Sequence, residues 1–147
     1  MDKPISSTLR TTFLVHWIFG GVLGVALFLA PGRLLTLLGW VDQWVQLPQS
    51  DQSIPGTTFV DAVIVRSLGA ALLGLAFASF LGWRARKWDA VALIVQSELV
   101  YCILGLLALI SGIFLMGRPM PAVGYVLMLI LAVFAIAWGL PLRRANS

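Results

Sequence analysis

One acidic residue, Glu98, lies within a run of hydrophobic residues that extends from Ala90 to Ile110. A charged carboxylate at the depth of a bilayer is costly unless it is paired, protonated or wetted. Tyr101 follows Glu98 by three residues and Cys102 by four, so the three share one face if the run is helical. His16 lies in another apolar run, and counting about 1.5 Å per residue places it at nearly the depth of Glu98.

We predict that Glu98 faces the interior of a helix bundle, where His16 or Tyr101 holds it. One interpretation is a proton-linked or ligand-binding pocket. The other is a structural clasp between helices, a kind of contact that contributes about 0.6 kcal/mol. Arg66 completes the predicted polar cluster, although it lies about 10 Å from Glu98 along the membrane normal by the same helical rise. Asp61 is an alternative partner for Arg66.

Other chemistry finds little support in the residue types. Cys102 is the only cysteine, so the chain has no internal disulfide and no cysteine-based zinc site. His16 is the only histidine; it could ligate the metal of a tetrapyrrole, although a lone helical histidine is more often a hydrogen-bonding partner. No metal site, cofactor or catalytic motif is clearly encoded, which favours a protein that is not an enzyme.

The elements that must position these residues are membrane-spanning helices. Of the 147 residues, 60% are hydrophobic and 11% are charged, against about a quarter charged in soluble domains. Four runs are long enough to cross a bilayer, at about 11–30, 59–82, 90–113 and 122–140. The sequence therefore predicts an all-α fold, a polytopic four-transmembrane-helix bundle that forms a single membrane domain over 1–147.

The connections carry their own signals. Pro31 and Gly32 end the first span, and the stretch LLTLLGWVDQW behind them is amphipathic enough for a short interfacial helix. It belongs to a loop over 31–58 that we expect to face outward. Lys and Arg gather at the opposite ends of the spans, which predicts that both termini are cytoplasmic. These basic residues are Lys3, Arg10, Arg84, Arg86, Lys87, Arg143 and Arg144, against Arg33, Arg66 and Arg118 on the outer side.

Small residues predict how the helices pack, because close backbone approach drives helix association in lipid. The second span has a ladder at every fourth position, Ala70, Gly74 and Ala78. Gly20 and Gly24 continue the face of the first span that begins at His16, and Gly105 lies near the face of Glu98. These stripes predict a tightly packed bundle.

Four segments carry a resemblance to known proteins: APGRLLTLLGW, RSLGAALLGLA, WRARKWD and SELVYCILGLLALISG. Their order resembles that of small bacterial four-helix membrane proteins of the DoxX-like and related uncharacterised families. The resemblance covers most of the chain through glycine and leucine patterns. It implies the four-helix fold and little chemistry.

Three functions follow as hypotheses. The first is a non-catalytic accessory or scaffold subunit of a larger energy-converting complex in the bacterial cytoplasmic (inner) membrane, with lipid and other membrane subunits or further copies of the chain as partners. The second is a small proton-coupled transporter that uses Glu98. The third is a protein that binds a lipid, quinone or pigment near His16, Glu98 and Tyr101. Nucleic acid is not an expected partner, because the basic residues flank apolar segments.

Overall fold

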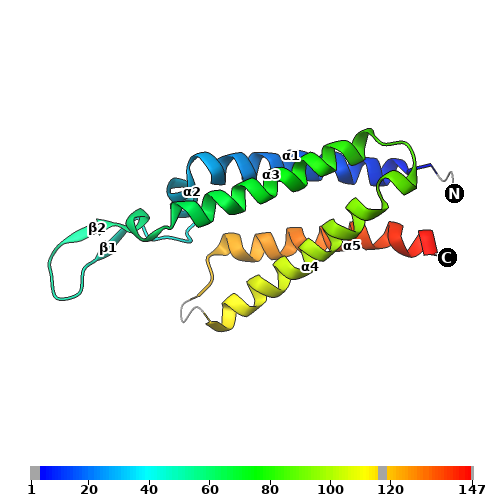
Figure 1. Ribbon diagram of the computed structural model, residues 1–147. Helices are drawn as coiled ribbons and strands as arrows, with labels where there is room; N and C mark the ends of the chain where they lie inside the picture. Colours follow the sequence, from blue (N-terminus) through cyan, green and yellow to red (C-terminus); the bar gives the residue numbers. More distant parts are fainter. Residues whose placement is uncertain (1–3, 116–118, 147) are drawn as a thin grey trace.

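A computed structural model describes residues 4–115 and 119–146, with side chains as far as Arg143. Lys3 and Arg118 lie outside the described residues, as does the side chain of Arg144. The described chain contains five α-helices and a two-stranded antiparallel hairpin (Figure 1). The helices are α1 (Ser7–Leu29), α2 (Pro31–Leu37), α3 (Ala62–Arg84), α4 (Ala92–Leu115) and α5 (Ala122–Asn146), and the strands are β1 (Trp44–Gln46) and β2 (Ser53–Pro55).

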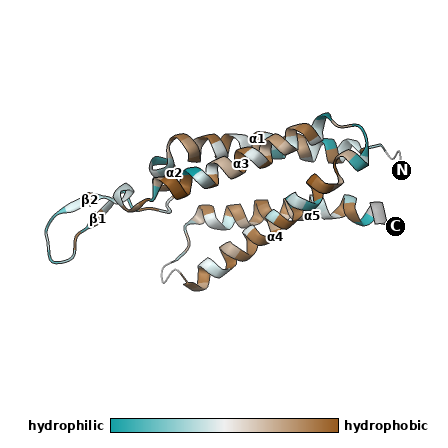
Figure 2. Ribbon diagram, viewed as in Figure 1, coloured by the Kyte–Doolittle hydropathy of each residue, from teal (hydrophilic) through white to brown (hydrophobic). Residues whose placement is uncertain are grey.

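Four of the helices match the predicted spans. α1, α3, α4 and the part of α5 from Ala122 to Arg143 are each long and apolar enough to cross a membrane. Figure 2 shows that hydrophobic residues predominate along these helices, with hydrophilic residues at the hairpin and near the ends of the described chain. The prediction of an all-α, four-helix membrane protein is confirmed.

Local sequence explains where the helices begin and end. The side chain of Ser6 accepts a hydrogen bond from the backbone N–H of Leu9 at the start of α1, and Asp61 caps α3 in the same way. α1 ends at Leu29, before Pro31, which opens α2 because proline suits the first turn of a helix.

The loop between α1 and α3 is more ordered than the sequence indicated. α2 is the predicted interfacial helix, but it begins before the stretch LLTLLGWVDQW and ends at Leu37. Gly39 then has a φ of 74°, a left-handed conformation that glycine adopts without strain and that ends the helix. Trp44 pairs with Pro55 in the hairpin, where a polar loop was expected.

The four long helices are arranged as two pairs. α1 packs along α3, and α4 packs along α5, whereas contacts between the pairs are sparse. The α1–α3 contact depends on glycine: a Cβ added at Gly69 would lie 2.8 Å from the backbone nitrogen of Phe28, and one at Gly24 would lie 3.1 Å from the carbonyl oxygen of Gly69. Figure 1 shows α4 beside α3 near the termini and diverging from it toward the hairpin end, whereas α5 runs alongside the α1–α3 pair.

The face of α3 that meets α1 differs from the predicted ladder. Gly69, Leu72 and Ala76 are buried, whereas Ala70 and Gly74 are exposed. A Cβ at Gly74 would meet nothing within 4 Å. Every-fourth-residue spacing identifies a stripe of small residues, but it does not show which of two adjacent stripes the neighbouring helix contacts.

Other predicted packing residues do lie between helices. A Cβ at Gly20 would lie 3.5 Å from the Cβ of Ala76, and one at Gly105 would lie 3.0 Å from a methyl group of Leu131. Ala78 is half-buried. Gly20 thus belongs to the α1–α3 contact and Gly105 to the α4–α5 contact.

The two pairs meet at the end of the bundle that carries the termini, which we call the closed end. A buried cluster there combines residues of α1, α4 and α5 with Val91, and consists of Leu9, Phe13, Val91, Val95, Cys102 and Trp138. The backbone N–H of Ile5 also donates to the carbonyl of Arg86, at 3.2 Å. The opposite end, beside the β1–β2 hairpin, is called the open end.

Candidate functional site

A buried chain of three polar side chains connects the two helix pairs. The Oγ of Ser79 on α3 lies 2.9 Å from Nδ1 of His16 on α1, and its hydroxyl donates to Oε1 of Glu98 on α4 at 2.9 Å. His16 Nδ1 lies 3.4 Å from the same Glu98 oxygen. Ser79 and Glu98 are fully buried and His16 is 6% exposed. Each residue comes from a different helix, so the chain forms only when three helices assemble.

Aromatic rings enclose this polar chain. The rings of His16 and Phe134 are nearly perpendicular, with centroids 4.9 Å apart. The Trp138 ring is also nearly perpendicular to His16, with centroids 5.8 Å apart. Phe13 packs on Trp138 at 4.9 Å. These rings exclude water from one side of the imidazole, which strengthens its polar contacts.

Two buried polar atoms beside the chain have no protein partner among the described residues, namely Glu98 Oε2 and Trp138 Nε1. Buried polar groups are almost always hydrogen-bonded, to protein or to ordered water. Since both atoms flank the chain, the closed end of the bundle has unused hydrogen-bonding capacity.

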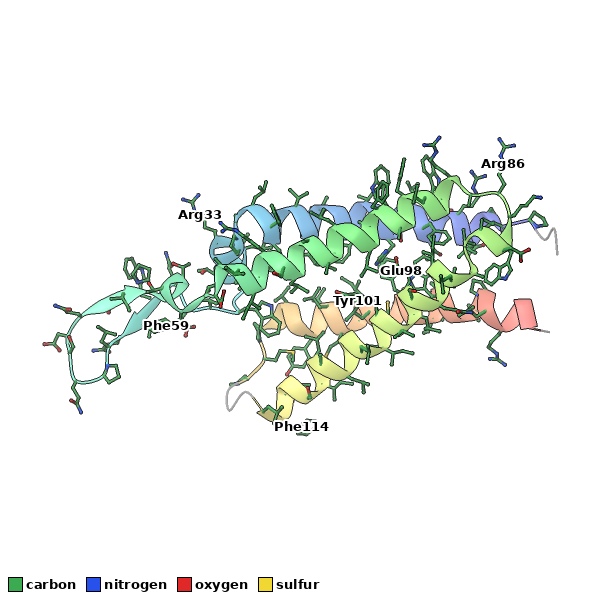
Figure 3. The ribbon with its side chains drawn as sticks, in the orientation of Figure 1. Arg33, Phe59, Arg86, Glu98, Tyr101 and Phe114 are labelled. Carbon is green, nitrogen blue, oxygen red and sulfur yellow. The ribbon has the colours of Figure 1, made fainter. Side chains whose placement is uncertain are left out.

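An apolar cavity adjoins the chain and extends toward the open end. It has a volume of about 330 Å³ and lies between the two helix pairs. His16 and Tyr101 are among the residues of its wall, and most of the remaining wall is aliphatic or aromatic, including Leu23, Leu109 and Trp40. Figure 3 shows Glu98 and Tyr101 projecting from α4 into the space between the pairs.

The structure brings together two of the four predicted polar residues. His16 and Glu98 are in contact, as the depth count predicted. Tyr101 is half-buried and lines the cavity, and no hydrogen bond joins it to Glu98 in the part of the chain that the structure describes. Arg66 is exposed, and its Nε donates to the carbonyl of Phe28 at 3.3 Å, so it belongs to the outer surface of the α1–α3 pair.

Sequence reasoning missed Ser79, which connects the other two residues. It is a hydroxyl residue within an apolar span, a signal that could have been noticed. Ser67 offers the same signal yet is exposed, so residue type alone does not distinguish the two positions.

Metal chemistry has little support in this site. The described residues contain no group of three or more His, Cys, Asp or Glu side chains that could hold a metal ion. The Nδ1 atom of His16 is engaged by Ser79. Ligation of a tetrapyrrole through the other ring nitrogen stays a prediction.

The chain matches no family model, no curated protein and no solved structure. The resemblance to DoxX-like proteins therefore stays a prediction.

Proposed function

We propose that this membrane protein binds a small amphiphilic molecule from the bilayer in the cavity between its two helix pairs. One observation carries the proposal: the wall of a largely apolar cavity includes His16, and a buried polar chain holds the imidazole of this residue in place. This is the third of the functions that the sequence suggested, a lipid-, quinone- or pigment-binding protein.

The lining suits a molecule with an apolar body and one polar group. Ligand pockets are mostly apolar, with a few placed polar groups, and range from about 300 to 1,000 Å³. This cavity is at the small end of that range. An apolar body would lie along Leu23 and Leu109, and a polar group would reach His16 and Tyr101.

The enclosed polar chain supports the same function. A buried ionisable residue in a membrane is costly, and such residues commonly mark a pathway or a ligand site. Glu98 and Ser79 hold His16 from one side, which leaves the cavity side of the imidazole available. A preorganised polar group of this kind favours binding because little ordering remains to be done when the ligand arrives.

Filling the cavity tests the proposal. Leu109→Trp would place an indole in the cavity, whereas Leu107→Trp, two residues away on α4, would place one on an exposed face where Leu107 is 57% exposed. Native mass spectrometry of protein purified in mild detergent would measure the bound small molecule. We expect a copurifying molecule with wild-type protein and Leu107→Trp, and its loss with Leu109→Trp. Equal retention by both variants would contradict the proposal.

The accessory-subunit hypothesis is a second candidate, and the exposed stripe on α3 favours it. Ala70 and Gly74 are small and exposed, and a Cβ at Gly74 would meet nothing within 4 Å, which suits the close approach of another subunit's helix. Gly74→Leu should then reduce copurification of other membrane subunits. Gly21→Leu is a matched control, because Gly21 on α1 also has open space around it.

Placement in the bacterial cytoplasmic membrane with both termini inside belongs to the same proposal. The excess of basic residues on one side of the spans supports it. The start of α1 and the end of α5 both lie at the closed end (Figure 1). A carboxy-terminal fusion to green fluorescent protein should fluoresce, and one to alkaline phosphatase should be inactive; the reverse pattern would overturn the orientation.

A further inference from the structure

We infer that the polar group of the ligand is a hydroxyl, and that this hydroxyl donates a hydrogen bond to Nε2 of His16. This inference rests on the proposed function, because it specifies the chemistry of the molecule that the cavity holds. Its basis is the direction of the hydrogen bonds through Ser79.

The hydroxyl of Ser79 has one proton, and it donates this proton to Oε1 of Glu98 at 2.9 Å. Ser79 Oγ and His16 Nδ1 also lie 2.9 Å apart, and the proton of this second hydrogen bond must therefore come from the imidazole. Glu98 Oε1, at 3.4 Å from the same nitrogen, is a second acceptor. Both contacts place the proton of the imidazole on Nδ1.

A neutral imidazole with its proton on Nδ1 has a lone pair on Nε2. A doubly protonated ring would instead direct an N–H among apolar and aromatic side chains, where an unpaired polar group is costly. His16 is buried against Phe134 and Trp138, and it lines the cavity. No described side chain forms a hydrogen bond with Nε2 of His16, so a ligand is its available partner.

The lone pair on Nε2 distinguishes ligands that can donate a hydrogen bond from ligands that can only accept one. A ketone, ester or ether oxygen can only accept, so it would face the Nε2 lone pair without forming a bond. A hydroxyl group can donate to Nε2 and can also accept from the phenol of Tyr101, which lines the same cavity from α4. The site therefore fits an apolar alcohol and discriminates against the ether of the same size.

Dodecanol and its methyl ether are a suitable probe pair, because they differ in the donor proton and one methyl group. Binding of each radiolabelled probe to the full chain in lipid nanodiscs gives two dissociation constants. We expect the alcohol to bind at least about tenfold more tightly, the effect of one well-formed hydrogen bond in a buried site. Equal binding of the two probes would overturn the inference and leave the proposed function standing, whereas binding of neither would overturn both.

Tyrosine variants test the site without disturbing the buried chain. Tyr101→Phe should weaken binding of dodecanol and of the ether by a similar several-fold factor, because either oxygen can accept from the phenol, and it should preserve the preference for the alcohol that His16 provides. The control is Tyr125→Phe, since Tyr125 is the other tyrosine of the chain and is 52% exposed. Loss of the preference for the alcohol over the ether in Tyr101→Phe would contradict the donor assignment.

The histidine can also be observed directly, because the chain has only one. In protein labelled with ¹⁵N-histidine, NMR should show a protonated Nδ1 and an unprotonated Nε2. Dodecanol should shift the Nε2 resonance, and the methyl ether should not. A protonated Nε2 beside an unprotonated Nδ1 would overturn the inference, whatever the affinities are.

Discussion

At the residue scale, the small side chain of Ser79 connects three helices. Its hydroxyl joins His16 to Glu98, and through them it joins α1, α3 and α4. Without Ser79, the only direct polar contact between the other two residues is 3.4 Å long. A hydroxyl at this position therefore determines both the stability of the buried chain and the orientation of the imidazole.

Ser79→Ala should lower the free energy of unfolding by about 1–3 kcal/mol, because it removes a donor to the buried Glu98 oxygen. Ser67→Ala is the control on the same helix, since Ser67 is exposed. It should change stability by less than about 0.5 kcal/mol. Reversible unfolding in mixed detergent micelles measures both. Equal effects would mean that the buried contact contributes nothing to stability.

Glu98→Gln distinguishes ligand binding from proton coupling. The glutamine carbonyl can still accept a hydrogen bond from Ser79. Because this acceptor is retained, we expect the dissociation constant of dodecanol to change by less than about threefold. A transporter that used Glu98 as its coupling acid would instead lose proton-driven flux. Parallel binding and proteoliposome flux assays decide the matter, and flux that Glu98→Gln abolishes would support the transporter hypothesis.

At the scale of elements, the closest helix contact is that between α1 and α3. Gly24 and Gly69 let the two backbones approach, and a side chain at either would meet backbone atoms of the facing helix. Backbone atoms cannot rotate away as a flexible side chain can, so the helices themselves would have to move.

Gly69→Ala should therefore destabilise the protein by about 1–3 kcal/mol, as overpacking in a tight interface does. Gly74 lies five residues away on an exposed face of α3. Gly74→Ala should be neutral or stabilising by up to about 1 kcal/mol, because alanine is the better helix former. The same unfolding measurement compares them. The packing described here would be wrong if Gly74→Ala were the more damaging of the two.

At the scale of the whole molecule, the bundle is asymmetric along its length. The closed end has a buried cluster and the His16–Ser79–Glu98 chain, whereas the cavity separates the pairs toward the open end. The polar contacts between the pairs therefore lie at the closed end, whereas at the open end the loop after α2 meets the start of α5 at Gly39 and Trp40.

Spin labels test this asymmetry. In a Cys102→Ala background, labels at Val25 and Val126 report on the open end, and labels at Thr11 and Leu140 report on the closed end, all on exposed positions of α1 and α5. We expect a broader distance distribution for the open-end pair, and narrowing of that distribution when dodecanol is added. Two equally narrow distributions would contradict a movable open end.

Composition and hydropathy determined the four spans, since a bilayer requires about 20 apolar residues whatever the helices pack against. They also placed His16 and Glu98 at one depth, because helical rise is constant. Only the tertiary structure decided that Gly69 rather than Gly74 meets α1, that Arg66 lies on the outer surface, and that Ser79 completes the polar chain. The physical reason is that lipid is as apolar as a helix interface, so hydrophobicity does not mark which face of a membrane helix is buried.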